Sequence, residues 1–247
     1  MQVGFRTDTG RKRAINEDAL LVLPGEGLFV VADGVGGGNS GELASRSAVN
    51  GIEEFLKNNP IANAADMEGK YRYNWFKGYF FRCFRKINHD IRNLAQENPE
   101  NEGMATTAVA AYFDGSELYI TNIGDSRAYM IRAGEISQLT DDHSYVADLV
   151  STGSLTKSEA RDHPRRNMIT RALGAGSEAE PDFYYFDLEP SDRLILCTDG
   201  LHGELTDEEI SETVKGEKDL NRACKKLIRK ANDKGGYDNI TVVCVEE

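Results

Sequence analysis

The sequence has few cysteines and prolines, and its cysteines form no motif. Its 247 residues include 4 cysteines and 6 prolines. The cysteines are widely spaced, without a CxxC pair, and each lies in an apolar run; they are Cys83, Cys197, Cys224 and Cys244. We therefore expect small buried residues in a reducing compartment rather than a disulfide framework.

Long apolar segments are missing as well. No run approaches the roughly 20 residues that span a bilayer, and the first residues, MQVGFRTDTGRKR, lack the apolar stretch of a signal peptide. We expect a cytoplasmic protein without a membrane partner. No repeat, linker or compositional break is visible, so we expect one continuous domain over residues 1–247.

Basic residues are outnumbered by acidic ones. The chain has 29 Lys and Arg against 41 Asp and Glu, a net charge of −12. Such a chain is poorly suited to nucleic acid or an anionic membrane, so we expect no nucleic-acid partner. An anionic substrate can still bind where a metal ion or an arginine dominates the local field. Hydrophobic residues make up 40% of the chain, enough for a sizeable core.

Short segments rich in β-branched and aromatic residues, most bounded by turn residues, predict strands. They are 19–22, 28–32, 107–113, 117–123, 127–133, 193–198 and 240–245. Only the sequence GDS separates 117–123 from 127–133, which favours a hairpin.

Between the strands, apolar residues recur at helical spacing. They predict helices from Leu43, over 76–94 and over 220–228, and Thr206 with Glu209 forms a capping-box pattern. This succession favours an antiparallel sheet covered by helices and leaves the topology open.

Four aspartates stand where predicted strands end or begin. Asp33 and Asp199 each follow an apolar strand and precede a glycine, Asp125 follows a third strand, and Asp238 lies just before the last one. We expect these four carboxylates to converge at one edge of a sheet.

Converging carboxylates repel one another unless a cation or raised pKa values compensate. Oxygen ligands without a Cys/His cluster of zinc spacing favour Mg²⁺ or Mn²⁺. The glycine after Asp33 and the glycine after Asp199 let the backbone approach closely, and a glycine carbonyl can be a ligand. A single Asp-Gly is usually a turn, but two after similar strands, with Asp-Asn before another, weaken that interpretation.

The segment RAINED brings Arg13, Asn16, Glu17 and Asp18 together in six residues. Taken alone, such a charge cluster is usually a solvated surface. Beside a metal site it would supply what phosphate chemistry needs: a guanidinium that holds two oxyanion oxygens, and acids that position metal-bound water.

Eight ordered motifs resemble those of the metal-dependent protein serine/threonine phosphatases of type 2C, most strongly the compact bacterial members. They are RKRAINEDA, VADGVGGGNSGELAS, GMATTAVAA, NIGDSRAYM, LTDDHS, HPRRNMITRALG, LCTDGL and YDNITVV. The resemblance runs from Thr7 to about Val245, and only residues 58–102 carry no motif of use.

The resemblance implies an α/β (α+β) sandwich, in which two antiparallel β-sheets pack face to face and are flanked by helix pairs. A binuclear metal site would lie at one end. By motif, Asp33 would bridge two Mg²⁺ or Mn²⁺ ions, the Gly34 carbonyl would bind one ion, and Asp199 and Asp238 would complete the shell of the other.

The resemblance also implies roles for residues around the two ions. Glu17 would hold a metal-bound water, with Asp18 close by. Arg13 would grip the substrate phosphate and, with Asp33 and Asp199, form the catalytic set. Asp125 would be a ligand of a third, weaker metal.

The implied activity is hydrolysis of phosphoserine and phosphothreonine through a hydroxide bridging the two ions, without a covalent nucleophile. The partners would be phosphorylated proteins, including a Ser/Thr kinase and its targets, and we expect a monomer that opposes this cytoplasmic kinase. Two alternatives remain: a catalytically inactive relative that binds phosphoproteins, and a hydrolase of small phosphoesters.

Two regions qualify the resemblance. Animal members carry a histidine, proposed as a general acid, at the position of Val35. Residues 144–174 resemble a mobile flap, in which we expect His163, like the preceding His143, to pack or hydrogen-bond. The flap sequence ARDHPRRN is basic, which fits either recognition of phosphorylated or acidic segments or a solvated loop.

Overall fold

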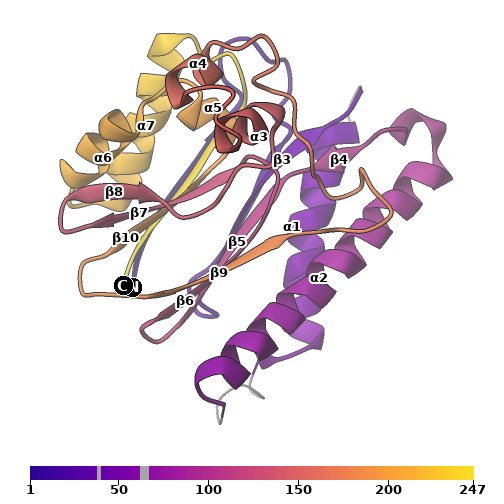
Figure 1. Cartoon of the computed structure of the whole chain (residues 1–247), viewed down its shortest axis with the longest axis horizontal. Coiled ribbons are helices and arrows are strands. Elements are labelled where there is room, and N and C mark those ends of the chain that lie inside the picture. Colours follow the sequence, from indigo (N-terminus) through magenta and orange to yellow (C-terminus); the bar gives the residue numbers. More distant parts are fainter. Residues whose placement is uncertain (38–39, 62–66) are drawn as a thin grey trace.

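Two antiparallel β-sheets pack face to face, and helices cover the outer face of each (Figure 1). This arrangement comes from a computed structural model that describes residues 1–37, 40–61 and 67–247. The first sheet has the order β1 (Gln2–Asp8), β11 (Ile240–Glu246), β10 (Arg193–Cys197), β7 (Arg127–Arg132) and β8 (Glu135–Gln138). The second has the order β2 (Asp18–Leu23), β3 (Leu28–Val35), β5 (Ala108–Asp114), β6 (Glu117–Ile123) and β9 (Asp182–Asp187), and β4 (Ala105–Thr106) pairs with β3. The sandwich expected from the sequence is confirmed.

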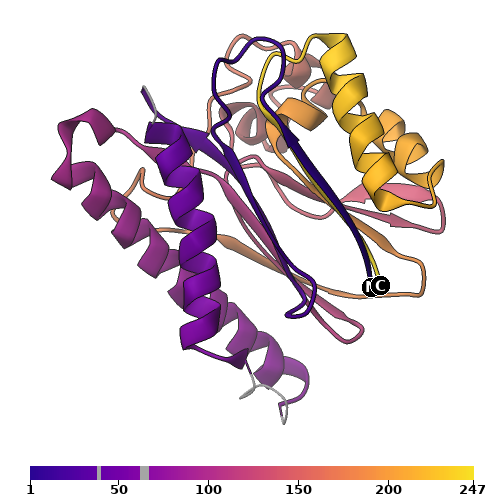
Figure 2. The ribbon, with the colours of Figure 1, turned by 180° about the vertical axis from the view of Figure 1, so that it is seen from behind.

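The helices are divided between the two outer faces, as the view from behind shows (Figure 2). The second sheet is covered by α1 (Ser40–Asn58) and α2 (Gly69–Glu97), and a 3₁₀ turn, η2 (Pro99–Asn101), follows α2. The first sheet is covered by α5 (Asp199–His202), α6 (Asp207–Lys215) and α7 (Leu220–Lys234). The two short helices α3 (Tyr145–Ser151) and α4 (Lys157–Arg161) lie near α5 (Figure 1).

Three apolar layers hold the sandwich together. Between the sheets, Phe29 and Val31 of β3 pack with residues of the opposite sheet such as Leu196 and Val243. The alternate residues of β3, Val30 among them, face α1 and α2. Both faces of the strand are therefore buried, which explains its continuous apolar run in place of a polar–apolar alternation.

The predicted helices and buried thiols are also observed. The aromatic stripe of α2 is buried against the second sheet, and the helix predicted over residues 76–94 is confirmed. The side chain of Thr206 accepts a hydrogen bond from the backbone N–H of Glu209 at the start of α6, and Glu209 completes the capping box. All four cysteines are free and buried.

The predicted hairpin between residues 117–123 and 127–133 is wrong. Strand β6 pairs with β5 and β9 in the second sheet, whereas β7 pairs with β10 and β8 in the first. Gly124, whose φ is +104°, lets the chain leave one sheet and enter the other between these strands. We call residues 124–126 the crossing. The strand pattern alone cannot distinguish a crossing from a hairpin, because both need two apolar strands and a short turn.

Four strands were not predicted: β1, β4, β8 and β9. In β1, Gly4 interrupts the strand pattern, and the structure shows why a glycine stands there. A Cβ at this position would lie 2.2 Å from the carbonyl carbon of Leu220, where α7 begins. Asp33 was expected directly after its strand but lies inside it, two residues before β3 ends. Within the described residues, no helix is long and apolar enough to cross a membrane.

Candidate active site

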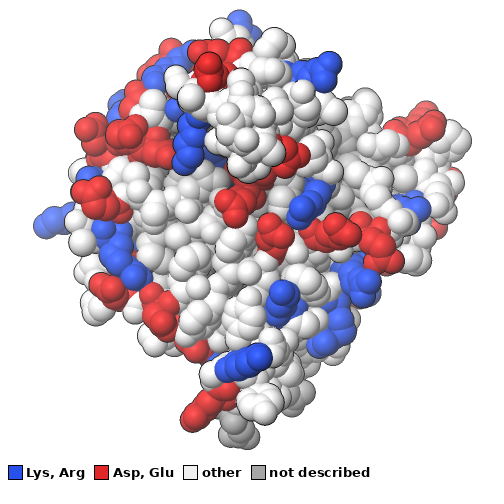
Figure 3. All heavy atoms as spheres, in the orientation of Figure 1, with Lys and Arg blue, Asp and Glu red and all other residues white. Residues whose placement is uncertain are grey.

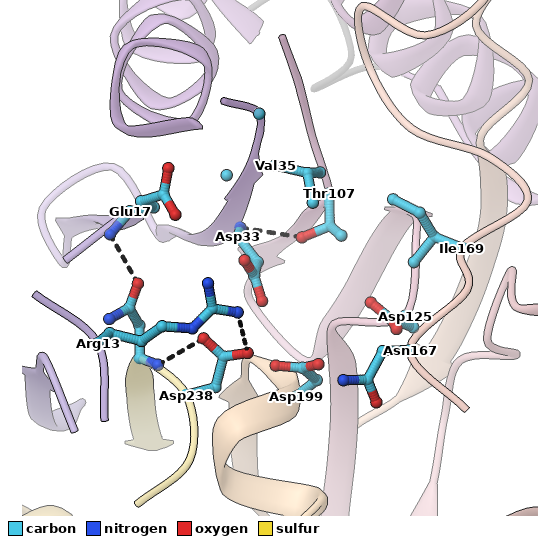
Figure 4. A pocket seen from close by; sticks show the side chains of 13 residues that line it. Arg13, Glu17, Asp33, Val35, Thr107, Asp125, Asn167, Ile169, Asp199 and Asp238 are labelled. Atoms are coloured by element: carbon cyan, nitrogen blue, oxygen red, sulfur yellow. Dashed lines mark hydrogen bonds and ion pairs between the residues drawn. The ribbon is translucent and has the colours of Figure 1, made fainter. Parts of the chain in front are cut away.

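One pocket at an end of the sandwich brings together the proposed metal ligands and the proposed phosphate-binding arginine. Its volume is about 160 Å³. The predicted residues that line it are Arg13, Glu17, Asp33, Gly34, Asp125, Asp199 and Asp238. Figure 4 shows the carboxylates of Asp33, Asp125, Asp199 and Asp238 around a common space. The expected convergence of the four aspartates is therefore observed.

Asp33 is held by hydrogen bonds of its own backbone. Its N–H donates to Thr107 Oγ1 at 2.9 Å, and its carbonyl oxygen accepts from Thr106 Oγ1 at 2.8 Å and from the Thr107 N–H at 2.9 Å. The backbone is thus fixed while the side chain points into the pocket (Figure 4). Thr107 also lines the pocket, although the sequence analysis assigned it no role.

Asp18 lies opposite Asp33 in the β2–β3 register. It is buried, and Thr198 Oγ1 donates a hydrogen bond of 2.9 Å to its Oδ2. Asp18 does not line the pocket, but its charge helps to raise the pKa of Asp33.

The glycines that follow Asp33 and Asp199 are required by close backbone packing. A Cβ on Gly34 would lie 2.0 Å from the carbonyl oxygen of Gly41, and a Cβ on Gly200 would lie 2.0 Å from that of Asn239. The prediction that these glycines allow close approach is confirmed. Any side chain at either position would push apart the elements that carry the acids.

Asn239 anchors the N-terminal segment to the site, a role that the sequence analysis missed. Its Oδ1 accepts the Glu17 N–H at 2.8 Å, and its Nδ2 donates to the carbonyls of Thr9 and Ile15, both at 2.9 Å. A buried, fully used asparagine thus fixes the loop that carries Arg13 and Glu17. Its position beside Asp238, just before an apolar strand, was the available signal.

Arg13 reaches across the pocket mouth to Asp238. Its Nη2 donates to Asp238 Oδ2 at 2.7 Å, and 48% of the arginine side chain remains exposed (Figure 4). The hydrogen bond to Asp238 raises the pKa of Arg13 above its ordinary value. The guanidinium is therefore charged, accessible and close to the carboxylates.

The carboxylates are held against electrostatic repulsion. Burial, followed by the charges of Asp18 and Asp199, raises the pKa of Asp33 well above its ordinary value. Burial and the neighbouring charges likewise raise the pKa of Asp199 to about 6 and that of Asp18 to about 7. For Asp125, burial and the charge of Asp199 raise the pKa well above the ordinary value. A cation in the pocket would relieve this repulsion.

Three buried carboxylate oxygens have no hydrogen-bond partner: Glu17 Oε1, Asp18 Oδ1 and Asp199 Oδ1. Unpaired buried oxygens are costly, and hard divalent cations prefer such donors. Among the residues that the structure describes, no three His, Cys, Asp or Glu side chains gather closely enough to hold a metal ion by themselves. The unpaired carboxylate oxygens therefore fit divalent cations that keep several of their waters.

Residues 144–174 form part of the pocket wall. The segment contains α3 and α4 and returns to the site at Asn167 and Ile169, which line the pocket. Ser144, the first residue of the segment, forms an antiparallel bridge with Ile169.

The arginines of the basic patch make contacts within the molecule. Arg161 donates to the Leu205 carbonyl at 3.3 Å, Arg166 donates to the Arg161 carbonyl at 3.1 Å, and Arg165 lies over the Tyr145 ring. On the face drawn in Figure 3, described basic side chains are interspersed with acidic ones. Recognition of acidic segments by the patch stays a prediction.

The position that carries a histidine in animal members is filled here by the half-exposed Val35, which lines the pocket. His143 is buried and hydrogen-bonded, as expected: its Nδ1 accepts the Gly124 N–H at 3.1 Å, and its Nε2 lies 3.1 Å from Asp182 Oδ2. His163 Nδ1 accepts the N–H of Arg165 at 3.1 Å, also in line with the expectation.

The fold and the site together define a phosphatase-type architecture, and comparisons with known proteins identify its family. A model of the protein phosphatase 2C family matches residues 8–242. The chain belongs to this family, which confirms the resemblance noted in its motifs.

Relatives match over nearly their whole length. The serine/threonine phosphatase stp of Listeria monocytogenes is 37% identical over 250 residues, covering 100% of this chain and 96% of the relative. The crystal structure of the serine/threonine phosphatase Stp1 from Staphylococcus aureus has a TM-score of 0.89 at 33% identity, covering 100% of this chain and 95% of that one. The catalytic domain of the phosphatase PstP, solved in complex with 2 manganese ions, has a TM-score of 0.84 at 33% identity and covers 99% and 97%.

Proposed function

We propose that this chain removes phosphate from phosphoserine and phosphothreonine in proteins, in a reaction that depends on Mg²⁺ or Mn²⁺. One observation carries the proposal: Asp33, Asp125, Asp199 and Asp238 converge with Arg13 in a single pocket. These carboxylates bring like charges together, and some buried carboxylate oxygens in this region have no hydrogen-bond partner. The accessible guanidinium of Arg13 lies beside them. This combination suits divalent cations and a phosphate group. Membership of the phosphatase family and the manganese-bound relative support it.

Each acid of the pocket has a proposed role in holding the ions. Asp33, the Gly34 carbonyl, Asp199 and Asp238 would together hold two ions. Asp125 would bind a third ion. When bound, the cations would lower the pKa of water and stabilise the charge on the phosphoryl group.

The remaining residues would orient water and substrate. The Glu17 carboxylate would accept hydrogen bonds from a water molecule in the pocket, and its position is fixed through Asn239. Arg13, catalytic in our proposal together with Asp33 and Asp199, would leave Asp238 and hold two phosphoryl oxygens, a geometry that suits a planar guanidinium.

The leaving oxygen would take its proton from water. Val35 has no proton to give, and His143 is occupied by Gly124 and Asp182. The buried cysteines lie in the apolar layers, so we assign them no part in the chemistry.

We further propose that the chain acts as a single catalytic domain, with residues 144–174 as a flap that shapes substrate choice. Its substrates would be phosphorylated proteins, among them a Ser/Thr kinase that it opposes and the targets of that kinase. The enzyme would be a cytoplasmic monomer.

The decisive experiment is phosphate release from a phosphothreonine peptide with Mn²⁺, with Mg²⁺ and with EDTA. We expect release with one or both metals, none with EDTA, and none from Asp199→Asn at the same protein concentration. A folded, metal-loaded protein that releases no phosphate would contradict the proposal. Phosphoprotein binding without hydrolysis would favour an inactive relative, and hydrolysis of mononucleotides alone would favour a small-molecule phosphatase.

A further inference from the structure

The crossing, residues 124–126, is held by the buried His143 and the partly buried His202, two histidines that the proposed chemistry does not use. It carries Asp125, whose side chain faces the pocket (Figure 4). His143 contacts Gly124 on one side, and His202 contacts the Asp125 backbone on the other. Since the crossing joins the two sheets, its position decides where the Asp125 carboxylate stands.

His202 is the last residue of α5, the short helix that begins with Asp199. Its Nε2 lies 3.0 Å from the carbonyl oxygen of Asp125. A carbonyl only accepts hydrogen bonds, so Nε2 carries the proton and donates it. His202 therefore ties the Asp125 backbone to the helix that carries Asp199.

The His202 side chain does not line the pocket, so it has no direct contact with a substrate bound there. Its hydrogen bond to the Asp125 carbonyl therefore suits a residue that acts through Asp125.

Other contacts hold the rest of the crossing. The Gly124 carbonyl accepts the His143 N–H at 3.0 Å, and the Ser126 hydroxyl lies 2.7 Å from that of Thr107, which also holds Asp33. These bonds fix the residues before and after Asp125. Within residues 1–37, 40–61 and 67–247, His202 is the one side chain that donates a hydrogen bond to the Asp125 carbonyl.

We infer that His202 is a positioning residue: its hydrogen bond to the Asp125 carbonyl sets the distance between the Asp125 and Asp199 carboxylates, and so the affinity of the weakest metal site. The inference rests on the proposed function, because it takes Asp125 as a metal ligand. Partners that orient a ligand usually change metal affinity by about 10–100-fold when they are lost.

The test compares substitutions at His202 that keep or remove the donor. In His202→Gln the amide N–H can occupy the place of Nε2–H, in His202→Asn it is too short, and His202→Leu has no donor at similar size. Mn²⁺ binding to the whole protein is measured by calorimetry, beside Asp125→Asn and the double variant His202→Leu/Asp125→Asn. Thermal unfolding in EDTA reports whether each variant folds.

We expect His202→Leu to weaken only the weakest Mn²⁺ binding step, by about 10–100-fold, and His202→Gln to stay near the wild type. The double variant should bind Mn²⁺ as Asp125→Asn does, because both changes act through one carboxylate. If His202→Leu does not fold, His202→Gln and His202→Asn still form a matched pair, with the loss expected only in His202→Asn.

Several results would overturn the inference. His202→Leu could weaken every Mn²⁺ binding step equally, or the double variant could show additive losses of Mn²⁺ affinity. The wild type could lack a weak third binding step, or His202→Gln could bind Mn²⁺ no better than His202→Asn. Failure of the proposed function is separable, since it would appear as a wild type that binds Mn²⁺ in calorimetry yet releases no phosphate from the peptide.

Discussion

The middle of the sandwich and its pocket end are built from the same strands but differ in what burial does to them. In β3, Phe29 and Val31 are fully buried between the sheets, where burial of apolar surface stabilises the fold. A few residues later the same strand carries Asp33, where burial raises the pKa and like charges add to the effect. The free energy gained by burying apolar side chains in the middle of the sandwich thus offsets the cost of bringing buried carboxylates together at its end.

This difference separates the residues that stabilise the protein from those that would catalyse its reaction. Catalytic sites commonly retain groups that lower stability, because the chemistry needs them. We therefore expect substitutions at the pocket end and in the middle to have opposite signatures in activity and stability. The following experiments examine that contrast, beginning with the largest effect.

Asp199→Asn should abolish hydrolysis while leaving the metal-free protein at least as stable as the wild type. Residues that only orient a metal ligand typically lower activity by up to roughly 100-fold when they are lost. Loss of the ligand itself should lower activity by more. Removing one of several repelling charges should keep or raise the melting temperature in EDTA. Phosphate release and thermal unfolding measure the two effects, with Asp233→Asn on the exposed face of α7 as control. A large drop in the melting temperature of the metal-free variant would contradict the expected difference between the pocket end and the middle of the sandwich.

Phe29→Ala should have the reverse signature. Its ring packs edge-to-face on Phe113 between the sheets, and such truncations cost about 3–5 kcal/mol in unfolding free energy. The loss should be the same with Mn²⁺ and with EDTA, and turnover per folded molecule should stay unchanged. Urea denaturation under both conditions measures it, and a loss below about 1 kcal/mol would show that the inter-sheet layer is not the main support.

Mn²⁺ itself should stabilise the fold through the pocket end. At a free concentration 100 times the dissociation constant, one bound ion raises the unfolding free energy by about 2.7 kcal/mol. Phe29→Ala should keep this increment, whereas Asp33→Asn should lose most of it. Denaturation with and without the metal measures the increment, and an equal gain in Asp33→Asn would mean that the ion binds elsewhere.

Arg13→Lys should weaken substrate binding by about tenfold, close to 1.4 kcal/mol, because an ammonium keeps the charge but not the two-pronged hydrogen bonding. We expect the effect as a higher KM. The stability of the metal-free protein should stay nearly the same, because the Arg13–Asp238 pair is partly exposed. Steady-state kinetics on the phosphothreonine peptide measure it. An unchanged KM would remove Arg13 from the phosphate-binding role.

Thr206→Ala should give the smallest effect. It removes the side-chain acceptor of the α6 capping box, which typically costs about 1 kcal/mol, and α6 lies outside the pocket. Urea denaturation should show the loss and phosphate release should not. A parallel fall in activity would mean that α6 is coupled to the site.

Much of the site follows from the sequence because strand ends and glycines are local features. An apolar run followed by Asp-Gly selected Asp33 and Asp199, and the pocket contains both, although Asp33 lies within its strand instead of after it. The sheet to which each strand belongs is decided by long-range pairing, so the turn through Gly124 resembled a hairpin. Asn239 escaped notice because its partners, Thr9, Ile15 and Glu17, lie more than 200 residues away in sequence.

The pairing of β1 with β11 places the two ends of the chain side by side, with Gln2 opposite Glu246 (Figure 1). The other end of the same pair, where Asp8 meets Ile240, leads towards Asp238 and the pocket. A short peptide joining the two ends would therefore close the chain without crossing the catalytic face. New ends could then be opened at the exposed β5–β6 turn around Gly115, so the protein lends itself to circular permutation.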